Sequence, residues 1–170
     1  MIKRDLTGLV FAVHLGDGTY GFGRVLRKQG RIYYIAAFDL IEEAVEDVMA
    51  YDMDKAKVIA LGNFYEDFLT GNNPRWIHAD YMYLPFVALP HYKILIDGQW
   101  YVENWQRTTM RHARGDEFEQ LSYRSDFAPS VLEDFLKWYA GLIPKQCVFD
   151  ELHPSQVYRT DVVKRYQVIE

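Results

Sequence analysis

Apolar runs and short glycine turns follow one another through the first quarter of the chain. Between Gly8 and Leu40, this pattern predicts three antiparallel strands. The two turns are Gly16-Asp17-Gly18 and Lys28-Gln29-Gly30, and glycine reaches the positive φ values that tight hairpin loops require. The predicted strands are Leu9 to Leu15, Thr19 to Leu26 and Arg31 to Phe38.

The pattern changes to helical spacing directly after these strands. Apolar residues recur on one helical face, and they are Leu40, Ile41, Ala44, Val45, Val48 and Met49. Four acids fall on the other side: Glu42, Glu43, Glu46 and Asp47. We therefore predict an amphipathic helix near Leu40–Ala50 that packs on the sheet and turns these acids outward. The four acids, called the acidic ridge below, are open to two interpretations: a solvated helix face or a partner-binding surface.

The middle of the chain predicts further strands. Lys55 to Leu61 reads as a fourth strand that Gly62-Asn63 ends, and Asn63 to Leu69 as one or two helical turns. Two β-rich runs across Asp97-Gly98 predict a hairpin. Its strands are Tyr92 to Ile96 and Gln99 to Glu103.

The clearest helix of the sequence lies near Pro129–Ala140. Ser130 and Glu133 have the spacing of a capping box, and Gly141 is a natural stop. In the tail, Val157-Tyr158 and Tyr166 to Ile169 read as short strands. Taken together, the elements predict an α+β fold: a strongly bent antiparallel β-sheet, or a partly open barrel, with two main helices.

Length and composition place the chain in a broad class. At 170 residues, with 49% hydrophobic residues, it is expected to form a single domain, residues 1–170, around a sizeable core. No apolar run approaches the roughly 20 residues of a membrane-spanning helix. The N-terminus lacks the apolar stretch of a secretory signal. We therefore expect a soluble, cytoplasmic protein without a membrane partner.

The net charge of −5 has a local origin. Seven acids and no base lie between Asp39 and Asp54, so the rest of the chain holds 17 acids against 19 bases. A nucleic-acid-binding protein is expected to show the opposite, a concentrated basic face. Nucleic acid is therefore an unlikely partner.

No sequence motif supports catalysis. The five histidines have no zinc-ligand spacing, no GxSxG elbow occurs, and the glycines of the first turns lie between strands rather than in a phosphate-binding loop. The single cysteine, Cys147, reads best as a small buried hydrophobic residue. We predict a protein that is not an enzyme, with no catalytic residues, no metal and no cofactor. A hydrolase would need His112 or His153 beside Cys147 in a cleft.

Aromatic and basic residues in the middle of the chain are the features that could indicate nucleic-acid binding. Trp76, Trp100 and Trp105 are better explained by core packing than by base stacking. Arg107, Arg111 and Arg114 form the only candidate basic cluster, and acids lie close to it in the sequence. A small β-barrel module that binds nucleic acid or another protein remains the alternative function.

The segment VFAVHLGDGTYGFGRVL, followed by a hydrophobic strand that ends at Phe38-Asp39, resembles immunity protein family 26. The matching pattern is an apolar strand, a turn with Asp17-Gly18, and then Tyr20 to Val25. The likeness is clearest over Gly8 to Asp39, roughly a fifth of the chain. Proteins of this family are associated with bacterial polymorphic-toxin and contact-dependent competition systems.

This resemblance implies a non-catalytic protein that binds a cognate toxin inside the producing cell and neutralises it. Many such toxins are cationic nucleases. A local acidic surface would speed the encounter with a cationic toxin and add charge complementarity. We therefore assign toxin binding to Glu42, Glu43, Glu46 and Asp47. That placement is our own inference, because the family name does not indicate which surface binds.

Overall fold

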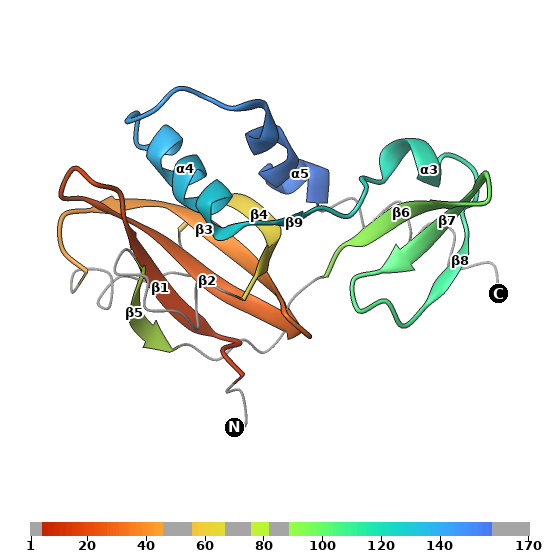
Figure 1. Cartoon of the computed structure of the whole chain (residues 1–170), viewed down its shortest axis with the longest axis horizontal. Coiled ribbons are helices and arrows are strands. Elements are labelled where there is room, and N and C mark those ends of the chain that lie inside the picture. The colour runs from red at the N-terminus through yellow and green to blue at the C-terminus, as the bar shows by residue number, and fades with distance from the viewer. Residues whose placement is uncertain (1–4, 46–55, 67–75, 82–88, 158–170) are drawn as a thin grey trace.

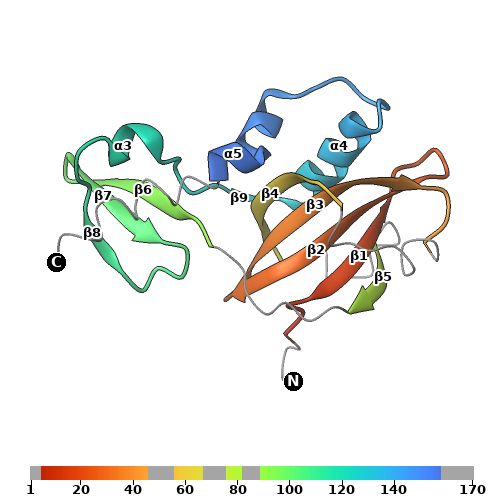
Figure 2. The same cartoon turned by 180° about the vertical axis from the view of Figure 1, so that it is seen from behind.

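Two β-sheets and a small set of helices make up this computed structural model, which describes residues 5–45, 56–66, 76–81 and 89–157. Figures 1 and 2 show the larger sheet on one side and the smaller sheet on the other. The larger sheet contains β1 (Leu9–His14), β2 (Tyr20–Gln29), β3 (Ile32–Glu42), β4 (Val58–Tyr65), β5 (Trp76–Tyr81) and β9 (Asp126–Phe127). The smaller sheet contains β6 (His91–Ile96), β7 (Gln99–Asn104) and β8 (Met110–His112).

The larger sheet has the strand order β5-β1-β2-β3-β4-β9. Its strands are antiparallel, except that β9 runs parallel to β4. The two predicted glycine turns are confirmed, since Gly16, Gly18 and Gly30 have φ values of 102°, 96° and 57°. The β2–β3 pairing shifts register twice, between Gly21 and Gly23 and between Val25 and Arg27, and local irregularities of this kind bend a sheet.

Both faces of the larger sheet are buried. Successive residues of a strand point to opposite faces, so Phe11 and Val13 pack on one side while Val10 and Ala12 pack on the other. The first face is covered by α4 (Pro129–Tyr139) and the 3-10 helix η1 (Cys147–Leu152). The second face receives Tyr92 and Trp105 from the region of the smaller sheet. The larger sheet therefore has a hydrophobic cluster on each of its two faces.

Glycine permits the close approach of η1 to the larger sheet. A Cβ atom on Gly62 of β4 would lie 2.7 Å from a side-chain carbon of Leu152, which is fully buried. Leu152 thus occupies the space that a side chain at position 62 would need. The short helix α5 (Pro154–Val157) follows η1.

The smaller sheet is the predicted hairpin with a third strand added. Its order is β6-β7-β8, and Asp97 and Gly98 form the β6–β7 turn with φ values of 49° and 76°. Helix α3 (Glu117–Gln120) lies against this sheet, where Phe118 stacks on Trp100 with ring centroids 5.9 Å apart. The hairpin prediction is confirmed.

The predicted fold class is confirmed as α+β with a bent, open sheet, and the helix near Pro129 is present. The capping box, however, is wrong. The N-cap is Ala128 and the helix begins at Pro129, whose fixed φ and missing N–H suit the first helical position. Glu133, the other residue of the predicted box, is buried.

Three segments differ from the prediction. The helix expected from Leu40 is wrong at its start, because β3 continues to Glu42 in register with β2; residues 46–50 lie outside the described part. The helical turns expected from Asn63 are also wrong, since β4 extends to Tyr65. Val157 ends α5 rather than forming a strand. The rest of the predicted tail strands lies outside the described residues. In the first two segments, pairing with a neighbouring strand overrides the helical spacing.

Within the described ranges, no helix is both long enough and apolar enough to cross a membrane.

Candidate binding surfaces

Acidic residues gather at one end of the larger sheet. Glu42 is the last residue of β3 and pairs with Tyr20, the first residue of β2; Glu43 follows it and is exposed. Asp17 lies in the turn directly before β2, so the same end of the sheet carries its carboxylate. The N–H and O–H groups of Thr19 donate hydrogen bonds to Asp17 and lower the pKa of this exposed carboxyl.

This end of the sheet matches only part of the predicted acidic ridge. Glu42 and Glu43 are placed by a strand end and not by a helix. Glu46 and Asp47 lie outside the described residues. Asp17 is an acid that the sequence interpretation assigned only to a turn, because the β2–β3 register that brings it near Glu42 is a tertiary feature.

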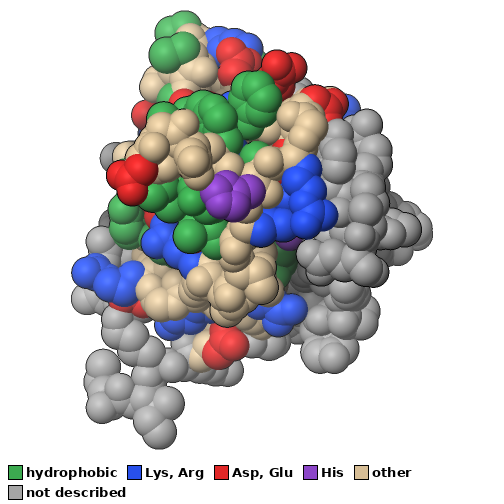
Figure 3. Space-filling view, turned by 90° about the vertical axis from the view of Figure 1, so that its right-hand side faces the viewer, with side chains coloured by type: hydrophobic (Ala, Val, Ile, Leu, Met, Phe, Trp, Pro, Cys, Tyr) green, Lys and Arg blue, Asp and Glu red, His purple; other side chains and the backbone are tan. Residues whose placement is uncertain are grey.

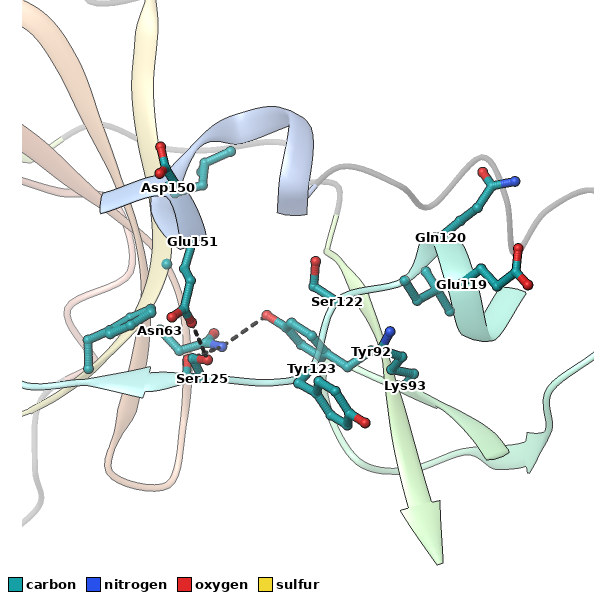
Figure 4. Close-up of a pocket in the computed structure, with 14 residues that line it drawn as sticks. Asn63, Tyr92, Lys93, Glu119, Gln120, Ser122, Tyr123, Ser125, Asp150 and Glu151 are labelled. Atoms are coloured by element: carbon teal, nitrogen blue, oxygen red, sulfur yellow. Dashed lines mark hydrogen bonds between the residues drawn. The ribbon is translucent and has the colours of Figure 1, made fainter. Parts of the chain in front are cut away.

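A second candidate surface is a groove between the two sheets. It encloses about 580 Å³, within the range of about 300–1,000 Å³ that is usual for ligand pockets. Figure 4 shows η1 on one side of it and α3 on the other. The groove is lined by Leu61, Gly62, Asn63, Tyr92, Lys93, Glu119, Gln120, Leu121, Ser122, Tyr123, Ser125, Phe127, Asp150 and Glu151.

Asn63 organises the floor of this groove. Its Oδ1 accepts a hydrogen bond of 2.7 Å from the indole Nε1 of Trp105, and its Nδ2 donates to the Tyr92 hydroxyl at 2.9 Å and to the Ser125 carbonyl at 3.3 Å. An indole N–H can only donate, so the orientation of the amide is determined. The guanidinium of Arg124 lies over the rings of Tyr92 and Trp105 and donates to the Trp105 carbonyl. One buried side chain thus connects both sheets.

Burial raises the pKa of Tyr92 to about 12, against the smaller lowering effect of the hydrogen bond from Asn63. The pKa of Tyr92 in the folded state therefore lies above the value of about 10 that it has in the unfolded chain. The stability that depends on a neutral Tyr92 is fully present below pH 10. That contribution, about 3 kcal/mol at most, is lost as the pH rises through 12. We therefore expect the free energy of unfolding to fall more steeply between pH 10 and 12 in the wild type than in Tyr92→Phe. Urea unfolding at each pH measures this free energy. An equal pH dependence in the wild type and in Tyr92→Phe would contradict the raised pKa of Tyr92.

The predicted basic cluster is divided into ion pairs. Arg107 lies 3.8 Å from the carboxylates of both Glu103 and Asp126. Arg111 makes two hydrogen bonds, of 2.8 and 2.6 Å, to the fully buried Glu117. The backbone N–H of Arg114 donates to the same Glu117 carboxylate. The ion pairs of Arg107 and Arg111 offset positive charge that binding to a phosphate backbone would require.

The tryptophans and the cysteine considered in the sequence analysis can now be placed in the fold. Trp105 is 1% exposed, which confirms core packing, whereas the side chain of Trp76 is not described. Cys147 is exposed at the start of η1, so its predicted burial is wrong. Its helix meets the core through Phe149 and Leu152 instead. Among the described residues, no group of three or more His, Cys, Asp or Glu side chains could hold a metal ion.

Sequence reasoning missed the groove entirely. Its floor comes from β4 and β6, and its walls come from segments near Glu119 and Glu151. These parts of the chain are far apart in the sequence and meet only in the folded protein. The polar stretch from Asn104 to Tyr123 offered no periodic signal that could have indicated such a wall.

The fold and these two surfaces define an α+β protein with an acidic sheet end and an open groove between its sheets. The family model described as Immunity protein 26 matches residues 7–109, which is more than half of the chain. The chain therefore belongs to this family of immunity proteins. Searches of curated proteins and of solved structures returned no significant match.

Proposed function

We propose that this protein binds the cognate toxin of a polymorphic, contact-dependent toxin system in the cytoplasm of the producing cell and neutralises it without catalysis. Membership of the Immunity protein 26 family carries this proposal. An immunity protein implies a toxin as partner, and direct binding is the simplest way to block one.

We further propose that the toxin is cationic, as a nuclease would be, and that it meets the acidic ridge. The support for this step is electrostatic. Glu42 and Glu43 share one end of the sheet with Asp17, and the arginines further along the chain are paired with acids. A surface of one sign speeds association with a partner of the opposite sign.

The first test is rescue together with a pull-down. The protein encoded next to this chain is expressed alone and together with it, and growth and co-purification are measured. Rescue with a stable complex is the expected result. Failure of both would overturn the proposal, and retention on heparin or DNA at low salt would then favour the nucleic-acid-binding alternative.

Neutralising the acidic ridge tests where the toxin binds. We expect the variant with Glu42→Gln, Glu43→Gln, Glu46→Gln and Asp47→Asn to lower the association rate constant about tenfold at low salt, because electrostatic steering is lost. The wild-type rate should fall as salt screens these charges, and the variant rate should change much less. Stopped-flow or surface-based kinetics between about 10 mM and 1 M salt measure both effects.

A matched control removes charge elsewhere. The pair Asp97→Asn and Asp134→Asn neutralises two acids of the β6–β7 turn and of α4, and is compared with the pair Glu42→Gln and Glu43→Gln. Asn tolerates the positive φ of Asp97. Equal kinetics for the wild type and the ridge variants would place the toxin on another surface.

A further inference from the structure

The two walls of the groove carry carboxylates that lack a basic partner. Glu119 projects from α3 and Glu151 from η1, on opposite sides in Figure 4. Both residues are exposed, and no lysine or arginine of the described segments forms an ion pair with either of them. Glu151 accepts a hydrogen bond of 2.8 Å from the Ser125 hydroxyl, which holds its carboxylate above the floor.

The other charges of the groove are already engaged. Asp150 pairs with Lys145 at 2.5 Å. Lys93 is the single base among the lining residues; it donates to the Phe118 carbonyl at 2.8 Å and lies over the rings of Trp100 and Tyr123. Two carboxylates on opposite walls are therefore available to separate basic groups of a bound segment, whereas an added phosphate or carboxylate would meet like charge.

The floor adds an independent indication of a ligand. Tyr92 is 5% exposed and its hydroxyl accepts a hydrogen bond from Asn63, whose orientation Trp105 determines. Within the described part of the chain, the hydroxyl proton of Tyr92 has no acceptor. A buried donor without an acceptor is costly, so a ligand that supplies a carbonyl oxygen would gain from this position.

We propose that the groove between the two sheets binds a segment of the toxin that carries lysine or arginine. This inference rests on the proposed function. Such a segment combines backbone carbonyls, which can accept from Tyr92, with basic side chains, which can pair with Glu119 and Glu151. The volume of about 580 Å³ suits a short stretch of polypeptide. Both the sheet end and the groove carry acids, so each is complementary in charge to a cationic toxin.

The test measures binding of the purified toxin, inactivated by mutation, to full-length variants by calorimetry. Glu119→Gln with Glu151→Gln keeps the size of both side chains and removes their charge. We expect this pair to raise the dissociation constant at least tenfold, which corresponds to about 1.4 kcal/mol. Tyr92→Phe removes only the hydroxyl and is expected to raise it by about threefold to tenfold.

The control pair Asp97→Asn and Asp134→Asn removes the same charge outside the groove and should change the dissociation constant less than twofold. Thermal unfolding of every variant verifies that each one folds. If the wild type binds and rescues while the groove variants bind equally well, this inference is wrong and the proposed function stands. If the wild type neither binds nor rescues, both fail.

Discussion

Replacing Asn63 with alanine is expected to lower the free energy of unfolding by about 2–4 kcal/mol. The residue is 2% exposed, and its amide accepts from the Trp105 N–H and donates to the Tyr92 hydroxyl oxygen and the Ser125 carbonyl. Alanine leaves the indole N–H buried without its acceptor, which is the expensive way to lose a hydrogen bond. Urea unfolding followed by tryptophan fluorescence and circular dichroism measures the change.

An exposed amide provides the matched control. Gln99→Ala, next to the β6–β7 turn, is expected to stay within about 0.5 kcal/mol of the wild type. A loss below about 1 kcal/mol for Asn63→Ala would show that the network contributes little. Because Asn63 joins the two sheets, we also propose that the chain unfolds as a single domain, in one transition seen by both probes. Two separate transitions would contradict this.

Replacing Gly23 with alanine is expected to destabilise the fold by about 3 kcal/mol, because it overfills a closed position. Gly23 of β2 lies directly opposite Phe11 of β1, and a Cβ atom there would come within 2.4 Å of the Phe11 ring and 3.0 Å of the Ala36 carbonyl oxygen. Phe11 is fully buried, so its ring has no free space into which to move. Chemical denaturation measures the loss.

A double-mutant cycle tests the cause of that loss. Phe11→Leu shortens the obstructing side chain, so we expect Gly23→Ala to cost at least 1 kcal/mol less in the Phe11→Leu background than in the wild type. Costs that add to within about 0.5 kcal/mol would mean that the ring is not the obstacle, and would point to the Ala36 carbonyl oxygen as the source.

Local chemistry made the turns predictable. A glycine with positive φ, as at Gly16, Gly30 and Gly98, has a conformational requirement that few other residues meet, so the hairpins could be read directly from the chain. The start of α4 was also readable, since Pro129 and the apolar spacing that follows act over a few residues. Its capping pattern was misread, because Ser130 lies inside the helix and makes no cap.

Long-range contacts decided the segments that were misread. Leu40 to Glu42 have helical spacing, yet strand pairing with β2 satisfies their backbone groups. Asn63 could have capped a helix, but its amide is used instead by Trp105 and Tyr92, residues 42 and 29 positions away. Propensity is a weak prior, and tertiary contacts of this kind override it.

The sequence by itself determined the bent sheet, its hairpins, the helix at Pro129, the local acidity and the family, because each of these follows from neighbouring residues or a contiguous motif. Only the tertiary structure decided where the candidate surfaces lie. Asp17 joins Glu42 through strand register, and Tyr92, Glu119 and Glu151 line one groove although the chain separates them. Such sites depend on how distant segments pack, and neither charge count nor periodicity encodes that packing locally.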